Sequence, residues 1–199
     1  MNPGSPPSVS LLDGVRELGF DVESLAELRL SGRDYRRAVP VLIAGLDDVA
    51  DDRELTEIVR ALSVPWASPS ALPSLIELFR SVDDPTGLAV RWTIGNTLEV
   101  LWDDRYFDEL VDLAGRREFG RAREMVVLGL ARSGRPETTA VLLELCDDAD
   151  VNGHAVRVLA RKTLARRVPE QARHVFERMS GDPRAWVRAA ASRGLRQLS

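Results

Sequence analysis

The chain repeats itself at intervals close to 33 residues, and this internal repeat is the feature that most restricts its fold. Five apolar segments align; they begin at Val39, Leu72, Phe107, Thr139 and Ala172, at intervals of 33, 35, 32 and 33 residues. Repeats of this length are typical of solenoids built from pairs of helices. Apolar residues recur in these segments at spacings of three and four, which places them on one helix face. The sequence therefore predicts five first helices.

A second series of amphipathic segments lies between the first five. These segments end on Leu62, Leu98, Leu130, Leu159 and Leu195. Small residues lie inside several of them, at Gly95, Gly129, Ala155, Ala190 and Gly194. Glycine within a helix costs up to about 1 kcal/mol relative to alanine, so close packing of neighbouring helices is the expected compensation. The two series together predict five helix pairs.

Turn-forming residues separate the two series, where one helix should stop and the next begin. Four such stretches are Asp83-Asp84-Pro85, Ser133-Gly134-Arg135-Pro136, Asp147-Asp148-Ala149-Asp150 and Ser180-Gly181-Asp182-Pro183. Aspartate and serine can cap the following helix, and proline fits its first turn. The sequence lacks clear alternating patterns typical of strands, so the predicted fold class is all-α.

Particular residues recur at matching places in the helix pairs. They are Pro40 and Pro73 in first helices and the pairs Val90-Arg91, Ala122-Arg123 and Val187-Arg188 at the openings of second helices. Asn152 and Leu55 replace the arginine in the fourth and first repeats. Together with the turn aspartates, this pattern resembles bacterial HEAT-repeat proteins with short repeats of the phycobilisome-lyase type, over about residues 35–198.

The resemblance implies a right-handed α-solenoid of about five HEAT-like helix pairs, with first helices on the convex side and second helices on the concave side. It also implies a surface that binds other macromolecules, usually proteins and sometimes nucleic acid. The segment from Leu11 to Leu30 predicts one or two short helices that cap the stack. We therefore expect a disordered tail at residues 1–7, a helical cap at residues 8–34 and HEAT-like repeats at residues 35–199, with cap and repeats forming a single domain.

Charge is distributed unevenly along the chain. Residues 1–112 contain 10 basic and 21 acidic residues, near −11, whereas residues 151–199 contain 11 basic and 3 acidic residues, near +8. A basic end can bind an anionic partner, although the same arginines can simply solvate the surface. No apolar run approaches the roughly 18 residues that span a bilayer, no signal-peptide pattern is present, and the single cysteine excludes an intramolecular disulfide. These features predict a cytoplasmic protein that does not bind membranes.

The openings of the second helices form the predicted binding surface, because they should make one ridge along the concave side. Its candidate residues are Arg91, Trp92, Asn96, Arg121, Arg123, Glu124, Asn152, His154, Trp186 and Arg188. Tryptophan and arginine supply large contact area and directional donors at interfaces. Backbone N–H groups at helix openings also favour anions.

Structural roles are the competing interpretation for several of these residues. Arginines of the Val-Arg pairs in HEAT repeats commonly bind the turn aspartate of a neighbouring repeat, which would place Arg91, Arg123 and Arg188 in an internal ladder. The two tryptophans of the predicted surface can also pack between adjacent repeats. Trp66 and Trp102 are expected to be core or hinge residues.

Motifs of common enzyme classes are absent from the sequence, including the nucleophile elbow, the Walker A loop, the dinucleotide-binding glycines and the zinc-protease motif. The two histidines, His154 and His174, lie on different predicted helices, and His154 is a candidate pH sensor. The aspartate runs around Asp48 and Asp148 lack the spacing of a calcium loop and suit helix capping. Cys146 is expected to be a small core residue. We therefore predict no catalytic residue, no metal site and no cofactor.

One enzymatic alternative stays open, because some HEAT-like proteins are DNA glycosylases that remove alkylated bases. Trp92, Trp102, Arg91, Arg123 and Glu124 resemble the tryptophan, arginine and acidic residues of the groove in those enzymes. The acidic N-terminal half opposes this alternative, since DNA binding requires a basic groove that neutralises phosphates.

Two non-enzymatic hypotheses are favoured over the glycosylase alternative. The first is a scaffold or adaptor that binds a protein partner on the concave surface. The second is a module that binds nucleic acid through the basic C-terminal half, and it would be favoured if Arg157, Arg161, Arg188 and Arg193 converged in one groove. The oligomeric state stays open, including head-to-tail association of the acidic and basic ends.

Overall fold

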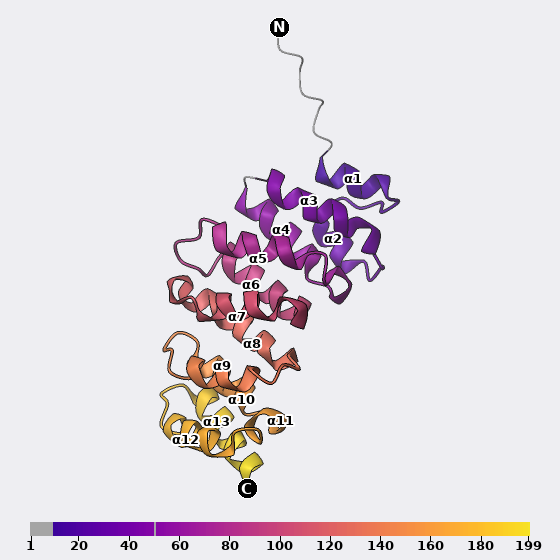
Figure 1. The fold of residues 1–199 in the computed structure, drawn as a ribbon. Coiled ribbons are helices and arrows are strands. Elements are labelled where there is room, and N and C mark those ends of the chain that lie inside the picture. The colour runs from indigo at the N-terminus through magenta and orange to yellow at the C-terminus, as the bar shows by residue number, and fades with distance from the viewer. Residues whose placement is uncertain (1–9, 50) are drawn as a thin grey trace.

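The protein is a stack of paired helices in a computed structural model that describes residues 10–49 and 51–199 (Figure 1). The tail expected at residues 1–7 lies outside this range. Helices α1 (Leu11–Glu17) and α2 (Leu25–Leu30) precede the five pairs. The first helices are α3 (Val39–Asp48), α5 (Leu72–Ser81), α7 (Phe107–Gly115), α9 (Thr138–Leu145) and α12 (Pro169–Met179). The second helices are α4 (Asp52–Leu62), α6 (Val90–Leu101), α8 (Glu124–Gly129), α10 (Asn152–Leu159) and α13 (Ala185–Leu198), and the short α11 (Lys162–Ala165) follows α10.

These helices confirm the all-α fold class. Within the described residues there is no strand, and no helix there combines the length and apolar character needed to cross a membrane. All five predicted helix pairs are present, and two short helices occupy the predicted cap.

The two rows of helices pack differently along the stack (Figure 1). Each second helix packs directly on the next, from α4 through α6, α8 and α10 to α13, whereas consecutive first helices touch one another much less. Helix α2 extends the second row by packing on α4, and α1 extends the first row by packing on α3. The second helices therefore form the more closely packed of the two rows, which we call the inner row.

One continuous hydrophobic core runs through the stack, from Val15 in the cap to Ala191 in α13. Leu75 of α5 and Ile94 of α6 are fully buried, so both rows contribute to it. A single helix pair cannot bury its apolar face alone, and each pair depends on its neighbours. Cys146 belongs to this core as predicted, and burial raises the pKa of its thiol to about 12.

Small residues within the second helices leave room for large rings, whereas the sequence predicted close approach of the helices themselves. A Cβ atom on Gly129 of α8 would overlap the ring of Trp102, which follows α6. A Cβ atom on Gly194 of α13 would overlap the ring of Phe176 in α12. Trp102 is half-buried against the core, as expected for a core or hinge residue.

The second helix of the third repeat differs from the prediction of one helix from Ala122 to Leu130. It consists of a 3₁₀ segment at Arg117–Arg123, the short α8, and another 3₁₀ turn at Leu130–Arg132. Gly120 lies two residues before Ala122 and interrupts the preceding 3₁₀ segment with a φ of 48°, a conformation that glycine adopts at little cost. Apolar periodicity did not reveal the 3₁₀ ends, because the turn of a 3₁₀-helix is close in length to that of an α-helix.

Candidate functional site

Four of the ten predicted binding residues come together at the openings of α8, α10 and α13. Arg121, Glu124, His154 and Trp186 line a hollow of about 500 Å³. We call it the Trp186 hollow; its other lining residues are Ala149, Asp150 and Arg184. Three consecutive repeats contribute to the Trp186 hollow, so it exists only when these repeats are stacked.

Trp186 packs between repeats and also faces solvent. Its ring lies 5.0 Å from that of His154, centroid to centroid, and the Arg184 guanidinium lies 5.7 Å from the Trp186 ring. Arg184 is held in place by hydrogen bonds to Oδ1 of Asn152 at 2.6 Å and to Oδ2 of Asp182 at 2.8 Å. The Trp186 residue nevertheless remains 42% exposed. The structure therefore confirms that Trp186 packs between repeats, while its exposed part leaves the predicted binding role open.

The polar side of the Trp186 hollow contains one nearly buried carboxylate. Nε of Arg121 donates to Oε1 of Glu124 at 2.8 Å, and Glu124 is 8% exposed. Burial lowers the pKa of His154, and the Glu124 carboxylate raises it. The charges of three arginines also lower it, so that the pKa lies below its ordinary value; they are Arg157, Arg121 and Arg184. His154 is therefore neutral at pH 7 and offers one donor and one acceptor rather than a charge.

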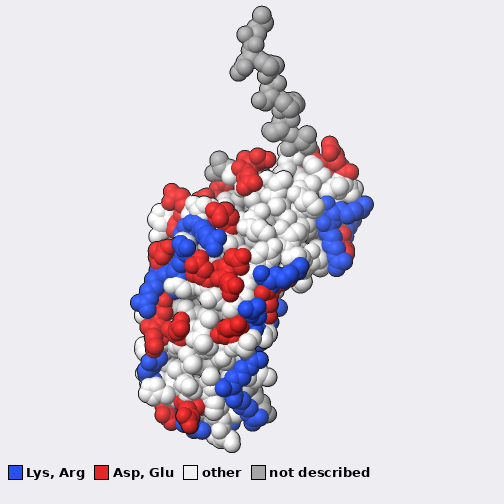
Figure 2. All heavy atoms as spheres, in the orientation of Figure 1, with Lys and Arg blue, Asp and Glu red and all other residues white. Residues whose placement is uncertain are grey.

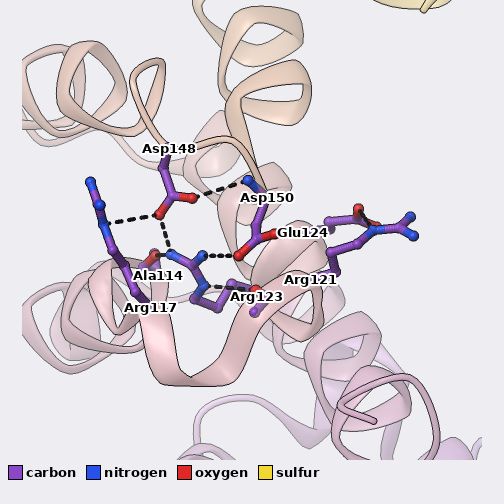
Figure 3. Close-up of polar contacts among 8 residues, drawn as sticks. Ala114, Arg117, Arg121, Arg123, Glu124, Asp148 and Asp150 are labelled. Carbon is purple, nitrogen blue, oxygen red and sulfur yellow. Dashed lines mark hydrogen bonds and ion pairs between the residues drawn. The ribbon is translucent and has the colours of Figure 1, made fainter.

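Arg123 lies in the interior instead of on the predicted binding surface (Figure 3). Its Nη1 donates to the carbonyl oxygen of Ala114 at 3.0 Å and to Oδ2 of Asp148 at 2.8 Å. Its Nε donates to the carbonyl oxygen of Gly120 at 2.8 Å, and its Nη2 lies 3.5 Å from Oδ2 of Asp150. Asp148 belongs to the turn of the next repeat, so the predicted ladder contact is confirmed for this arginine.

Asp148 is held in its ionised form by the same cluster (Figure 3). Burial raises the pKa of this carboxyl group. The hydrogen bond from Arg123, the N–H of Asp150 at 3.1 Å and the charges of Arg123 and Arg117 outweigh burial and bring the pKa below its usual range. The buried arginine therefore faces a full negative charge across the boundary between the third and fourth repeats.

The predicted ladder contact is wrong for Arg91 and Arg188, which bind carbonyl groups of their own repeats. The Arg91 guanidinium donates to the carbonyl oxygens of Phe79, Val82 and Asp84, at 2.9 Å for Phe79 and Asp84. Nη1 of Arg188 donates at 2.8 Å to two carbonyl oxygens of the turn before α13. Phe79 lies in the last turn of α5, where carbonyl groups lack intrahelical partners, so Arg91 satisfies one of them locally.

Asp84, the turn aspartate of the second repeat, is occupied within its own turn. It is 6% exposed and accepts hydrogen bonds from the N–H groups of Gly87 at 2.9 Å and of Ala89 and Arg91 at 3.0 Å. The hydroxyl of Thr86 donates a fourth bond at 2.9 Å. Burial raises the pKa of Asp84, but these bonds outweigh burial and lower it below its usual range. Its oxygens are thus engaged by the loop that opens α6.

Removing the Asp84 charge is expected to destabilise the protein in a pH-dependent way. Folding lowers the Asp84 pKa, so its contribution is present above the ordinary value of 3.8 and is lost as pH falls through the folded value. Asp84→Asn should reduce the free energy of unfolding by about 1–3 kcal/mol at pH 7, because the amide directs a donor at N–H donors. Urea unfolding at pH 7, 5 and 3 measures this effect, with the exposed Asp83→Asn as control. Equal destabilisation at every pH would contradict the prediction.

The other predicted residues lie apart from the Trp186 hollow. Trp92 on α6 is 38% exposed, and Nδ2 of Asn96 donates to its carbonyl oxygen at 2.8 Å. Asn152 reaches the hollow only through its bond to Arg184. The residues considered for a glycosylase groove do not line one hollow, because Arg123 is buried and Trp102 packs into the core.

Two charged residues of the Trp186 hollow, Arg184 and Asp150, are not among the residues predicted from the sequence. Arg184 lies two residues before Trp186, directly after the turn Asp182-Pro183. Asp150 was assigned to helix capping as part of an aspartate run. The signal that could have found both is their place at the openings of second helices, where the other lining residues also lie.

The aspartate runs have structural partners. Asp51 caps α4 by accepting from the N–H groups of Arg53 at 2.9 Å and Glu54 at 3.0 Å. Asp148 binds Arg123 as described above. Across residues 10–49 and 51–199, no three His, Cys, Asp or Glu residues are grouped so as to hold a metal ion.

A second and larger hollow, of about 710 Å³, lies at the opposite ends of the inner helices. We call it the arginine hollow, because it is lined by Arg132, Arg157, Arg161 and Arg193. Three of the four arginines named as a test of nucleic-acid binding thus converge, whereas Arg188 does not line it. Figure 2 shows acidic and basic side chains interspersed over much of one face. Three of the eleven basic residues of residues 151–199 therefore line the arginine hollow, and the other eight lie elsewhere.

Comparison with solved structures identifies designed repeat proteins of similar fold. One designed armadillo repeat protein has a TM-score of 0.53 and 18% identity, with 98% of this chain and 96% of that chain covered. Another, in complex with the peptide (KR)4, has a TM-score of 0.58, 18% identity and the same coverage. An engineered protein has a TM-score of 0.55 and 20% identity, with 96% and 99% covered. No family model and no curated protein matches the chain. At these identities the comparison supports the helical repeat fold alone.

Proposed function

We propose that this protein is a non-enzymatic scaffold or adaptor that binds a protein partner on the inner surface formed by its second helices. The Trp186 hollow is the observation that carries this proposal. An exposed tryptophan there adjoins oriented arginines, and these residue types dominate binding energy at interfaces. One of the structural neighbours is itself in complex with a peptide, which supports binding of a protein segment by such a fold.

The proposal includes the finer assignments made from the sequence. We place the chain among the short HEAT-type repeats, with residues 8–34 capping a single domain and with a cytoplasmic location. Arg121, Glu124, His154 and Trp186 are the central binding residues. Trp92 and Asn96 belong to a neighbouring part of the same inner surface, while Arg91, Arg123 and Arg188 act by organising their repeats.

Replacing Trp186 with alanine is expected to abolish capture of the partner. Truncation of an interface tryptophan commonly costs about 2 kcal/mol or more, which weakens binding at least about tenfold. Affinity purification from nuclease-treated lysate, followed by mass spectrometry, compares wild type with Trp186→Ala. His174→Ala is the matched control, because His174 is an exposed aromatic residue on the first helix α12.

The proposal predicts one discrete partner that survives nuclease, is lost in Trp186→Ala and is kept in His174→Ala. A crosslinking amino acid at the exposed Ala189 of α13 should then attach covalently to that same partner. Capture that is equal in all three proteins would place the interface elsewhere and contradict the proposal.

A second candidate function, binding of nucleic acid, is favoured by the convergence of arginines in the arginine hollow. Its hallmark is recovery of nucleic acid that is sensitive to nuclease and that falls steeply with salt concentration. The excess of acidic residues in the N-terminal part, 21 acidic against 10 basic over residues 1–112, opposes a long polyanion along the whole surface. We therefore place this function second.

A further inference from the structure

The arginine hollow is built by four consecutive second helices and the turns that follow them. Glu99 of α6, Leu128 of α8, Val158 of α10 and Gln197 of α13 mark the contribution of each repeat. The hollow lies at the carboxyl ends of these helices, whereas the Trp186 hollow lies at their openings. His154 and Arg157 are three residues apart on α10, and the charge of Arg157 acts on the His154 pKa. The two hollows therefore adjoin along the inner surface.

Two of the four arginines are oriented by bonds within the protein. Nε of Arg132 donates to Oε1 of Glu99 at 3.1 Å, which joins the third repeat to the second. Nη1 of Arg161 donates to the carbonyl oxygen of Ala131 at 2.5 Å, which joins the fourth repeat to the third. These bonds restrict both side chains before any ligand arrives, so less entropy is lost on binding.

The other two arginines are available to a ligand. Arg157 and Arg193 are exposed, and within residues 10–49 and 51–199 neither makes an ion pair or a side-chain hydrogen bond. They lie on neighbouring helices, α10 and α13, that pack directly on each other. Two unpaired guanidinium groups on one wall favour a ligand with at least two negative charges, since each can bind a carboxylate with two parallel hydrogen bonds.

The floor between the arginines is apolar, and the negative charge at its edge limits the length of the ligand. Leu128, Ala131 and Val158 line the hollow alongside the charged groups. Glu99 lines its N-terminal edge, and beyond α6 lies the N-terminal part of the chain, in which residues 1–112 contain 21 acidic and 10 basic residues. A long phosphodiester chain would meet this acidic region, because it carries a charge at every unit. A short segment with acidic and apolar side chains fits both the walls and the floor.

The geometry points to the arginine hollow as a docking site for a short acidic segment of a protein, in which carboxylates bind Arg157 and Arg193 and an apolar side chain rests on Leu128 and Val158. This inference rests on the proposed binding of a protein partner and names the chemistry of the segment bound. The Trp186 hollow and the arginine hollow then act on neighbouring parts of one partner.

Fluorescence anisotropy with labelled synthetic peptides tests the inference on the full chain. The probes are the acidic peptide GEELEEG, its neutral analogue GQQLQQG, its basic analogue GKKLKKG and a single-stranded oligo(dT). Wild-type protein is expected to bind the acidic peptide and neither analogue, with affinity falling as salt rises. Arg157→Gln/Arg193→Gln should weaken binding of the acidic peptide at least about tenfold, because two charge-assisted contacts are lost together.

The matched control is Arg173→Gln/Arg196→Gln, which removes two exposed charges from α12 and α13 outside the hollow. It should change binding by less than about threefold, since screening weakens distant charges. Absence of binding by folded wild-type protein, or equal loss in both double variants, would overturn the inference. Tighter binding of oligo(dT) that is lost only in Arg157→Gln/Arg193→Gln would also overturn it and assign the hollow to nucleic acid.

Failure of this inference can be distinguished from failure of the proposed function. If a partner is captured through Trp186 while no acidic peptide binds, the scaffold proposal stands and the inference of an acidic segment is wrong. If Trp186→Ala leaves capture intact while the acidic peptide depends on Arg157 and Arg193, the Trp186 surface is wrong and the arginine hollow stands.

Discussion

Arg123→Met is expected to destabilise the protein by about 3–5 kcal/mol, because it leaves a buried carboxylate with only the exposed Arg117, 3.7 Å away, as its partner. Arg123 is 0% exposed and Asp148 is 7% exposed, so water cannot readily replace the lost bonds (Figure 3). The carbonyl groups of Ala114 and Gly120 lose their donors in the same substitution. This is a large fraction of the stability of a domain of this size.

Chemical unfolding followed by circular dichroism measures this effect. The matched control is Arg105→Met, which removes an exposed arginine paired with Asp103 within one repeat and should change stability little. The double variant Arg123→Met/Asp148→Asn should recover part of the loss, because the unpaired charge is then absent as well. Equal stability of Arg123→Met and Arg105→Met would contradict the buried ion pair.

The position of Arg123 also predicts how the protein unfolds. Repeat proteins approximate a chain of units coupled only to their neighbours, and Arg123 joins the third repeat to the fourth through Asp148. Weakening this boundary should let the C-terminal repeats unfold before the N-terminal ones. Hydrogen exchange should then show faster exchange in α10 and α13 than in α4 and α6 of the same variant. Uniform acceleration throughout the stack would contradict this expectation.

Phe79→Ala is expected to cost about 3–5 kcal/mol, because it removes a large ring from a fully packed site. Phe79 is 0% exposed, and its ring meets that of Phe119 edge to face with centroids 5.3 Å apart. The Arg91 guanidinium lies over the ring of Phe119, 5.0 Å from its centroid. The cavity would therefore open between the second and third repeats.

Urea unfolding of Phe79→Ala, Phe79→Leu and Phe119→Ala measures this contribution. Phe79→Leu keeps most of the side-chain volume and should cost less than Phe79→Ala. Phe119 is only half-buried, so Phe119→Ala should also cost less. If Phe79→Ala costs no more than Phe119→Ala, the ring of Phe79 does not fill the boundary between these repeats.

Much of the fold could be predicted from the sequence, because the repeat and the apolar periodicity are local properties of the chain. The five first helices begin at or within three residues of the aligned positions, from Val39 to Ala172. Tight packing at the glycines within helices was also predictable, because glycine there costs stability unless packing compensates. At Gly95 the neighbour is the backbone of the next repeat, whereas at Gly129 and Gly194 it is an aromatic ring. These features depend on which residues neighbour one another along a helix.

Part of the candidate site could be predicted for the same reason. Arg121, Glu124, His154 and Trp186 all lie at the openings of second helices, and stacking brings equivalent positions of adjacent repeats together. Arg184 and Asp150 complete the hollow but lie in turns, where apolar periodicity carries no signal. The convergence of Arg157 and Arg193 could not be predicted, because their helices are neighbours in space and not along the chain.

The sequence by itself determined the repeat, the helices and the positions that open them, whereas the tertiary structure decided what each arginine at those positions does. Arg123 and Arg188 occupy equivalent places, yet Arg123 is fully buried and Arg188 is exposed. The fourth repeat presents Asp148 to Arg123, whereas Arg91 and Arg188 bind carbonyl groups of their own repeats. Burial and ion pairing depend on the neighbouring repeat, and a local motif contains no information about that neighbour.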